Sequence, residues 1–283
     1  MTEPDWKEIT SVAPEHLVDP ALELRRAVQL VASAGQTFAE PRGDDSHRAM
    51  TWDARLRAFV GVPFAGPYPF RMALRPEDLT LVLLDRLDET LGSLPLVGVT
   101  RDEAYEWMSI GMATYLGGAP PKIERPAYDT PDHPVRTARF TRGTEAARRT
   151  LAALYGGVAL LIAELIEDRN HASEIRCWPH HLDIGTRLVV ESDERGNATK
   201  TIAVGLAPMG GGYPSWYLYV SLWPPPRPQE LPPLATGAWH TKGWTGAVLT
   251  GDEVAALADE ERPERVRTFL RSSVAAASLV LGS

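Results

Sequence analysis

Residues 176–185 gather side chains that can do acid/base or metal chemistry. Within ten positions they include His180, His181, Asp183 and the single cysteine of the chain, Cys177. Successive side chains of an extended strand alternate between its faces, so a strand here predicts His181 and Asp183 on one face and His180 on the other. An imidazole beside a carboxylate can hold a divalent metal or act as an acid/base pair. We therefore expect His181 and Asp183 to belong to one site.

A third ligand is available in His240, which lies in another strand-like run, residues 238–249. Two histidines and a carboxylate suit Zn²⁺, and they match the facial arrangement of non-haem Fe(II) sites. We predict His181, Asp183 and His240 as catalytic residues and metal ligands of a hydrolase-type enzyme, in which the metal activates a water molecule. A further interpretation is an Fe(II) oxygenase. A keto-acid cosubstrate would need a basic residue soon after the distal histidine, and only Lys242 is there.

The competing interpretation is a ligand-binding or interaction protein without catalysis, in which these histidines are structural. A buried histidine commonly satisfies its ring nitrogens with a carboxylate or a backbone carbonyl. In either case, polar groups among large aromatic side chains must find partners, and such places are typical of small-molecule pockets. The residues expected to bind substrate or shape the pocket are Trp178, His180, Tyr217, Tyr219 and His47.

Two further groups have an ordinary structural explanation. Asp44, Asp45 and His47 stand on a polar turn, where short side chains bond the local backbone more often than they bind ligands. If His47 folds against His181, the two clusters would line one pocket. Cys177 lies about 13 Å along a strand from His181, too far for activation, so we expect a buried and inert thiol.

The composition bounds the class of protein. The chain has 283 residues, 44% of them hydrophobic and 23% charged, with a net charge of -8. This balance argues against a nucleic-acid-binding surface, which needs clustered positive charge. One cysteine, no apolar N-terminal segment and no apolar stretch longer than residues 158–162 predict a soluble, cytoplasmic protein without a membrane partner. The oligomeric state stays open.

Helix signals occur at four places. Asp19 before Pro20 suits a helix start, with Gly35 as its end, and Thr100 with Glu103 forms a capping box. The expected helices span residues 19–35, 101–116, 144–168 and 263–280. In the third, apolar residues recur at three- and four-residue intervals, which is typical of a helix that faces the core.

Strand-like composition marks much of the remaining chain. The expected extended segments are residues 48–64, 70–74, 79–84, 175–191, 200–207, 215–223 and 238–249. Residues 79–84 are also compatible with a helix, because Leu and Asp dominate this segment. Residues 119–134 are rich in proline and read as an irregular loop. The three glycines at 210–212 lack the lysine and the strand–loop–helix context of a phosphate loop, so a flexible turn is expected.

These elements predict an α+β fold, with one or more antiparallel sheets and segregated helices packed on one face. We expect a single domain over residues 1–283. Its N-terminal half, residues 1–135, mixes helices and strands. Its C-terminal half, residues 136–283, combines a helix with an antiparallel sheet.

Three motifs in the second half resemble an uncharacterised bacterial family known as a domain of unknown function. In that family a Phe-Asp-Leu-Ala strand end precedes a Gly-Phe-x-Pro-Gly turn, and a Tyr-x-Tyr strand with a proline-rich exit follows. The matching pieces here are Leu182-Asp183-Ile184-Gly185, Gly205-Leu206-Ala207-Pro208, and Trp216-Tyr217-Leu218-Tyr219 running into Trp223-Pro224-Pro225-Pro226.

In the first half, Gln36 and His47 stand at equivalents of a helix-then-His pattern of that family, so the resemblance extends to nearly the whole chain. The family often has small residues where this chain has His180 and His181, which leaves Asp183 as the shared polar residue. The resemblance implies the fold and a bacterial origin, and no activity.

Overall fold

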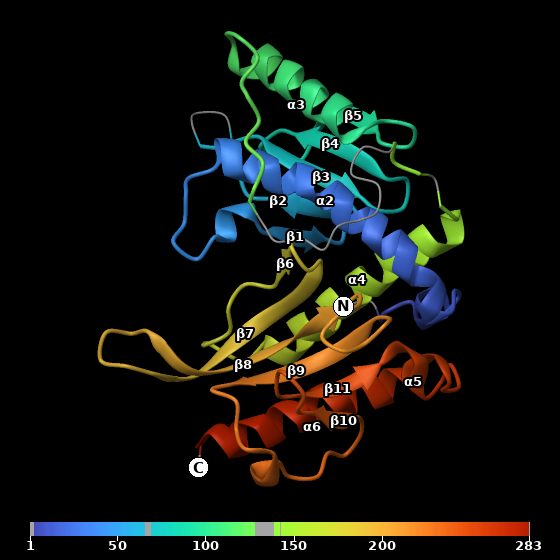
Figure 1. The fold of residues 1–283 in the computed structure, drawn as a ribbon, viewed down its shortest axis with the longest axis vertical. Helices are drawn as coiled ribbons and strands as arrows, with labels where there is room; N and C mark the ends of the chain where they lie inside the picture. The colour runs from blue at the N-terminus through green and yellow to red at the C-terminus, as the bar shows by residue number, and fades with distance from the viewer. Residues whose placement is uncertain (1–2, 66–68, 128–138, 142, 283) are drawn as a thin grey trace. The chain divides into compact units, whose positions relative to one another are not determined.

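The computed structural model describes residues 3–65, 69–127, 139–141 and 143–282. Their contacts divide the chain into two compact units (Figure 1). Unit 1 consists of residues 3–18, 153–176 and 183–282, and unit 2 of residues 19–152 and 177–182. Each unit combines an antiparallel sheet with helices, so the predicted α+β class is confirmed.

The sheet of unit 2 has the strand order β6-β1-β2-β3-β4-β5. Its strands are β1 (Met50–Asp53), β2 (Ala58–Gly61), β3 (Arg71–Arg75), β4 (Thr80–Leu84), β5 (Thr90–Pro95) and β6 (Arg176–Trp178), which pairs with β1 through Cys177. The helical segments of this part of the chain are α2 (Val18–Phe38), η2 (Ser46–Arg48), α3 (Arg101–Leu116) and the first turns of α4 (Glu145–Ile166). Helix α3 lies along the edge strand β5 (Figure 1).

The sheet of unit 1 has the strand order β10-β11-β9-β8-β7, with antiparallel neighbours throughout. Its strands are β7 (Asp183–Ser192), β8 (Ala198–Ala207), β9 (Tyr217–Trp223), β10 (Ala238–His240) and β11 (Gly246–Thr250). The helical segments are α1 (Trp6–Ile9), η1 (Pro14–Leu17), η3 (Pro228–Glu230), α5 (Gly251–Ala255), α6 (Arg262–Gly282) and the remainder of α4.

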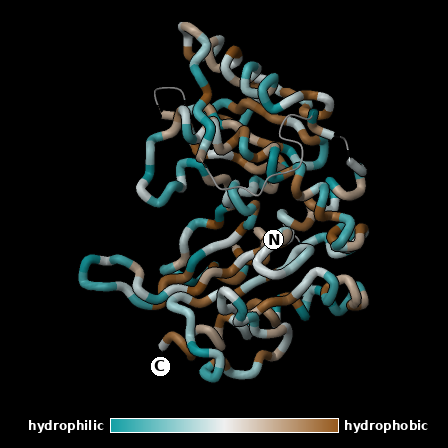
Figure 2. Tube along the Cα trace, viewed as in Figure 1, coloured by the Kyte–Doolittle hydropathy of each residue, from teal (hydrophilic) through white to brown (hydrophobic). Residues whose placement is uncertain are grey.

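One face of the unit 1 sheet forms an apolar core. Ile184, Leu206, Leu218 and Leu249 stand side by side across four strands, and each is at most 2% exposed. Helix α6 packs on these strands. Figure 2 shows hydrophobic positions along the strands of this sheet and hydrophilic ones at the tip of the β7–β8 hairpin. Because strand side chains alternate, the intervening residues lie on the opposite face of the sheet.

The four predicted helices are present. Thr100 accepts a hydrogen bond from the Glu103 amide, and the Glu103 carboxylate accepts one from the Thr100 amide, as the capping box predicts. The predicted end of the first helix at Gly35 is wrong, since α2 continues to Phe38. A Cβ atom at Gly35 would collide with the backbone carbonyl of His47, so this glycine permits close backbone approach.

Among the described residues, α4 is the one helix long and apolar enough to span a membrane by length and composition. Half of its most apolar stretch is buried inside the protein, which is typical of a core helix in a soluble protein. Its side chains at Leu151, Leu154, Tyr155 and Val158 are buried, as their spacing predicts.

The predicted strands over residues 48–64 and 238–249 are each divided into two shorter strands. Residues 48–64 contain β1 and β2 joined by a turn, in which the Asp53 carboxylate accepts a hydrogen bond from the Leu56 amide. Residues 238–249 are interrupted by a loop between β10 and β11, with Gly243 at a φ of 86°. Strand β5 was not expected, because its sequence, Thr-Leu-Gly-Ser-Leu-Pro, has one β-branched residue and no aromatic residue and contains glycine and proline. Residues 128–134 of the proline-rich connector lie outside the described residues.

Candidate functional site

The predicted strand over residues 175–191 is wrong at its centre, because residues 179–182 form a turn between β6 and β7. The Leu182 amide donates to the carbonyl of Trp178 over 2.7 Å, and Leu182 adopts a φ of 59° with its side chain fully buried. Gln29 on α2 holds this turn through its side-chain nitrogen, 2.6 Å from the carbonyl oxygen of Pro179. Strand alternation therefore does not relate His181 to Asp183.

The residues predicted to form one site fall in different units on either side of the end of this turn. His180 and His181 belong to unit 2, whereas Asp183 begins β7 of unit 1. The two imidazole centroids are 4.4 Å apart, and Trp178 lies 6.1 Å from His180. Burial and the neighbouring charge of His181 lower the pKa of His180, against the opposing effect of Asp45. His181 is exposed.

His47 is buried on η2 within unit 2. The amide of Arg42 lies 3.2 Å from its Nδ1, and Nε of Arg48 lies 3.2 Å from its Nε2. The Asp44 carboxylate accepts a hydrogen bond from the Ser46 amide, which is the turn chemistry favoured from the sequence. The charge of Asp45, on the same turn, opposes the lowering of the pKa of His180.

Cys177 is fully buried and stands opposite Met50 in the β1–β6 pair. Its burial agrees with the inert thiol expected from the sequence.

Tyr219, on strand β9 of the unit 1 sheet, forms a hydrogen bond to Asp183. The Tyr219 hydroxyl donates to Oδ2 of Asp183 over 3.0 Å. The sheet register aligns Gly185 on β7, Gly205 on β8 and Tyr219 on β9. A Cβ atom at Gly205 would lie 2.7 Å from the Tyr219 hydroxyl oxygen, and one at Gly185 would lie 3.1 Å from it. The two glycines therefore form a cradle for the phenol ring.

Four aromatic side chains continue this surface beyond Tyr219. Tyr217 lies two residues before it on β9, and the two ring centroids are 6.3 Å apart, so both lie on one face of the sheet, as strand alternation requires. Tyr213 packs 4.6 Å from Tyr217, and His240 packs 5.4 Å from Tyr213. Trp244 stacks on His240 at 4.6 Å with an interplanar angle of 26°.

Hydrogen bonds fix both His240 and Trp244. Nδ1 of His240 lies 3.2 Å from the Tyr213 hydroxyl, and its Nε2 lies 2.7 Å from the carbonyl oxygen of Lys242. The indole nitrogen of Trp244 donates to the carbonyl of Gly211 over 2.9 Å. We call Asp183, Tyr213, Tyr217, Tyr219, His240 and Trp244 the aromatic–carboxylate surface.

Burial raises the pKa of Tyr217 to about 12, and the charge of Asp183 and the neighbouring Tyr213 act in the same direction. Burial also raises the pKa of Tyr213, with a contribution from the charge of Glu253 on α5. These phenols are therefore hydrogen-bond donors near neutral pH and do not act as bases.

The glycine loop at residues 210–212 packs against this surface. Its three residues have φ values of 97°, 62° and 101°, which side-chain-bearing residues rarely adopt. A Cβ atom at Gly211 would lie 2.6 Å from the Tyr217 hydroxyl oxygen. The sequence identifies this segment correctly as a turn between two strands, but it does not reveal this contact.

Among the described residues, no group of three or more His, Cys, Asp or Glu side chains is arranged to hold a metal ion. Asp183 and His240 bond different tyrosines, and His181 belongs to the turn of unit 2. The proposed Zn²⁺ or Fe(II) site at His181, Asp183 and His240 stays a prediction. Elemental analysis of the purified protein tests it, because about one metal ion per chain, lost in His181→Ala, would confirm it.

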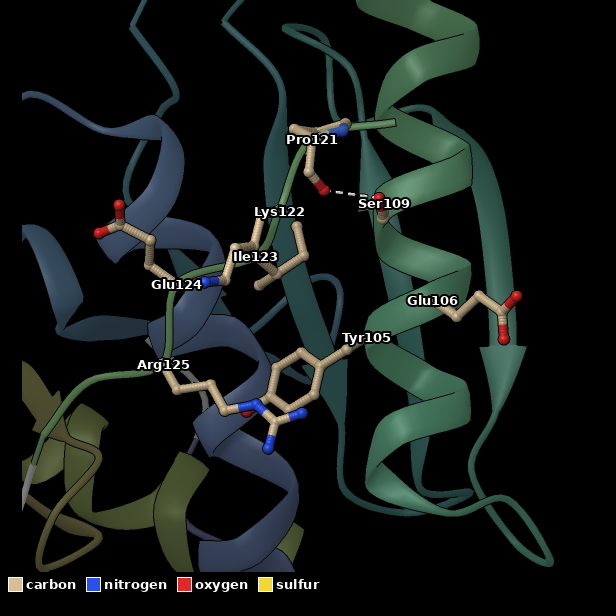
Figure 3. A pocket seen from close by; sticks show the side chains of 8 residues that line it. All are labelled: Tyr105, Glu106, Ser109, Pro121, Lys122, Ile123, Glu124 and Arg125. Carbon is tan, nitrogen blue, oxygen red and sulfur yellow. Dashed lines mark hydrogen bonds between the residues drawn. The ribbon is translucent and has the colours of Figure 1, made fainter. Parts of the chain in front are cut away.

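A surface pocket of about 710 Å³ opens in unit 2 between α3 and residues 121–125 (Figure 3). The Ser109 hydroxyl donates to the carbonyl of Pro121 over 2.6 Å, and the Arg125 guanidinium lies 4.4 Å above the Tyr105 ring. The other side chains that line it are Glu106, Lys122, Ile123 and Glu124. The sequence gives no signal for this pocket, because its wall is the irregular segment that leaves α3.

A second pocket of unit 2, of about 610 Å³, is lined by ion pairs. Arg57 pairs with Glu77, Arg75 with Asp78 over 2.8 Å, and Arg149 with Glu145 over 3.4 Å. Because these charges are largely satisfied within the unit, this pocket offers less for a ligand than the aromatic–carboxylate surface does.

Comparisons with known proteins found no matching family model, no matching curated protein and no matching solved structure.

Proposed function

We propose that this protein is a soluble, cytoplasmic binding protein for a small organic molecule, which lies on the aromatic–carboxylate surface of unit 1. The observation that carries the proposal is the pair of glycines beneath Tyr219. Each glycine inside a strand costs about 0.5–1 kcal/mol relative to alanine. Two glycines aligned on neighbouring strands lower the stability of the sheet, but they leave room for the Tyr219 phenol beside the Asp183 carboxylate.

The exposure of the surface supports binding. Tyr213, Tyr219, His240 and Trp244 are each partly exposed, whereas Tyr217 below them is buried. Aromatic rings of this kind offer large, rigid contact area to a ligand, and hydrogen bonds within the unit fix the Tyr213, Tyr219 and Trp244 rings in place. The buried tyrosine and the glycine loop hold these rings in place from beneath and from one side.

Binding fits the contacts of this surface better than catalysis does. Both ring nitrogens of His240 are within hydrogen-bonding distance of Tyr213 and Lys242. Oδ2 of Asp183 already accepts a hydrogen bond from Tyr219, and Tyr213 and Tyr217 keep their protons near neutral pH. A general base needs an available proton acceptor beside the reacting group. The ligand-binding interpretation is therefore the one that these contacts favour.

Ligand-observed NMR and tryptophan fluorescence test the proposal, with a panel of soluble sugars, planar aromatic compounds and amines. We expect at least one class to bind and to lose about ten-fold or more in affinity in Trp244→Leu. Trp223→Leu is the matched control, because Trp223 is 63% exposed at the far end of β9. Binding that survives Trp244→Leu, or no binding by any class, would overturn the proposal.

A further inference from the structure

The charges next to the aromatic–carboxylate surface are negative. Asp183 lies within the surface, bonded to Tyr219, and its charge reaches Tyr217. Glu253, held in the capping box of α5, acts on Tyr213. A ligand placed over these rings therefore lies near the Asp183 carboxylate and in the negative field to which Glu253 contributes.

The aromatic rings also present negative electrostatic potential to a ligand. The face of a tyrosine or tryptophan ring carries negative potential and attracts a cation that lies within about 6 Å of its centroid. The Tyr217 ring has three aromatic neighbours, whose ring centroids lie 4.6–6.3 Å from its own. They are Tyr213, Tyr219 and Trp244. A cation placed near one of these rings is thus close to the next ring as well.

Arg187 and Lys242, the basic residues that follow Asp183 and His240 in the sequence, do not form an anion site with them. Arg187 stands on the same face of β7 as Asp183, but four residues along the strand, about 13 Å away, and it is exposed. Lys242 contributes its backbone carbonyl to His240, and its residue is exposed. A ligand that carried a carboxylate or phosphate would meet Asp183 and Glu253 with like charge.

We infer that the ligand of this surface carries a positive charge, as a protonated or quaternary amine held between the aromatic rings and the Asp183 carboxylate. This inference rests on the proposed function, and it adds the chemical class of the ligand. Burial is the main cause of the raised pKa values of Tyr213 and Tyr217, and the charges of Glu253 and Asp183 act in the same direction.

Isothermal titration calorimetry with two matched probes tests the inference. Choline and 3,3-dimethylbutan-1-ol have nearly the same shape, but only choline is charged. We expect choline to bind at least ten-fold more tightly than the neutral alcohol, a difference of about 1.4 kcal/mol. Asp183→Asn keeps the size of the side chain and an acceptor for Tyr219, and we expect it to remove most of this preference.

Glu194→Gln is the control for overall charge, because it removes one carboxylate at the tip of the β7–β8 hairpin and should leave the preference intact. Equal binding of the two probes, or a preference that persists in Asp183→Asn, would overturn the positive charge and leave the proposed function standing. The same holds if neither probe binds while a neutral sugar or aromatic compound does. If no compound binds, both proposals fail. The comparison of the two probes on the unmodified protein does not depend on the folding of any variant.

Discussion

Tyr219 takes its position from two residues that lack a side chain. Gly185 and Gly205 leave room for its ring, and its hydroxyl reaches Asp183 across the intervening strand β8. This arrangement costs stability in two strands and gains one defined contact between a phenol and a carboxylate. At these two positions, the absence of a side chain lowers the packing stability of the strands and permits the contact between Tyr219 and Asp183.

Replacement of Gly205 tests this cradle. In Gly205→Ala the new Cβ would lie 2.7 Å from the Tyr219 hydroxyl oxygen and would collide with the carbonyl of Ile184. We expect the free energy of unfolding to fall by about 1–3 kcal/mol, because overpacking displaces the ring or the strand. Chemical denaturation measures this loss. Gly111→Ala is the control, since no atom lies within 4 Å of its added Cβ and a helix interior favours alanine.

The hydroxyl of Tyr217 predicts a loss of stability at high pH. Its pKa is raised from 10.0 to about 12 in the folded protein. Between these values the unfolded chain has lost this proton and the folded chain retains it, so the stabilisation present below pH 10 is lost as the pH rises toward 12. We expect Tyr217→Phe to lose less stability than the unmodified protein between pH 9 and pH 11. Denaturation midpoints that fall equally with rising pH in the two proteins would contradict this expectation.

At the residue scale, the sequence predicts which side chains of one strand share a face, but it does not predict which side chains of different strands are in contact. Tyr217 and Tyr219 lie on one face because strand alternation is local. The bond between Tyr219 and Asp183 joins residues 36 positions apart, and it depends on the register of three strands. Trp244 and His240 likewise meet only after β10 and β11 have paired.

At the scale of elements, helix ends were predictable where a side chain caps them. Thr100 and Glu103 fix the start of α3, and Thr144 accepts a hydrogen bond from the Ala147 amide at the start of α4. The break between β6 and β7 was not predictable, since Leu182 carries no local preference for a φ of 59°. Tertiary contacts, such as the bond from Gln29 to Pro179, hold that turn instead.

The cap of α3 gives a direct test of a local signal. Thr100→Ala removes the acceptor for the Glu103 amide, and we expect it to lower the stability of this helix by about 1 kcal/mol. Hydrogen exchange of the first turn of α3 measures the effect. Thr114→Ala is the control, because Thr114 bonds the carbonyl of Ile110 inside the same helix and alanine is the better helix former. Equal loss in both variants would contradict the capping role.

At the scale of the molecule, unit 1 is assembled from separate pieces of chain. Arg267 on α6 donates to Glu3 over 2.7 and 2.6 Å, and it donates to Glu164 on α4 over 3.1 Å. Ile9 packs so closely on α4 that a Cβ atom at Gly157 would lie 2.9 Å from its side chain. The pattern of helix and strand signals predicts the α+β class, but it contains no signal for this discontinuous division.

Arg267→Ala should therefore weaken the attachment of the N-terminal segment and of α4. We expect the free energy of unfolding to fall by about 1–3 kcal/mol, because three charge-assisted contacts to two carboxylates are lost. Faster hydrogen exchange at residues 5–17 should accompany this loss. Arg195→Ala, on the exposed turn of the β7–β8 hairpin, should change neither measurement.

The division of unit 1 also sets an order of events during synthesis. Glu3 and Arg267 are 264 positions apart, so at roughly 5–20 residues per second the partner of Glu3 emerges about 13–50 s later. During this interval all of residues 19–152 leave the ribosome, while Trp6 and Ile9, which are buried in the finished protein, still lack the helix and strands of their own unit. The nascent N-terminal segment is therefore a natural place for a chaperone to bind.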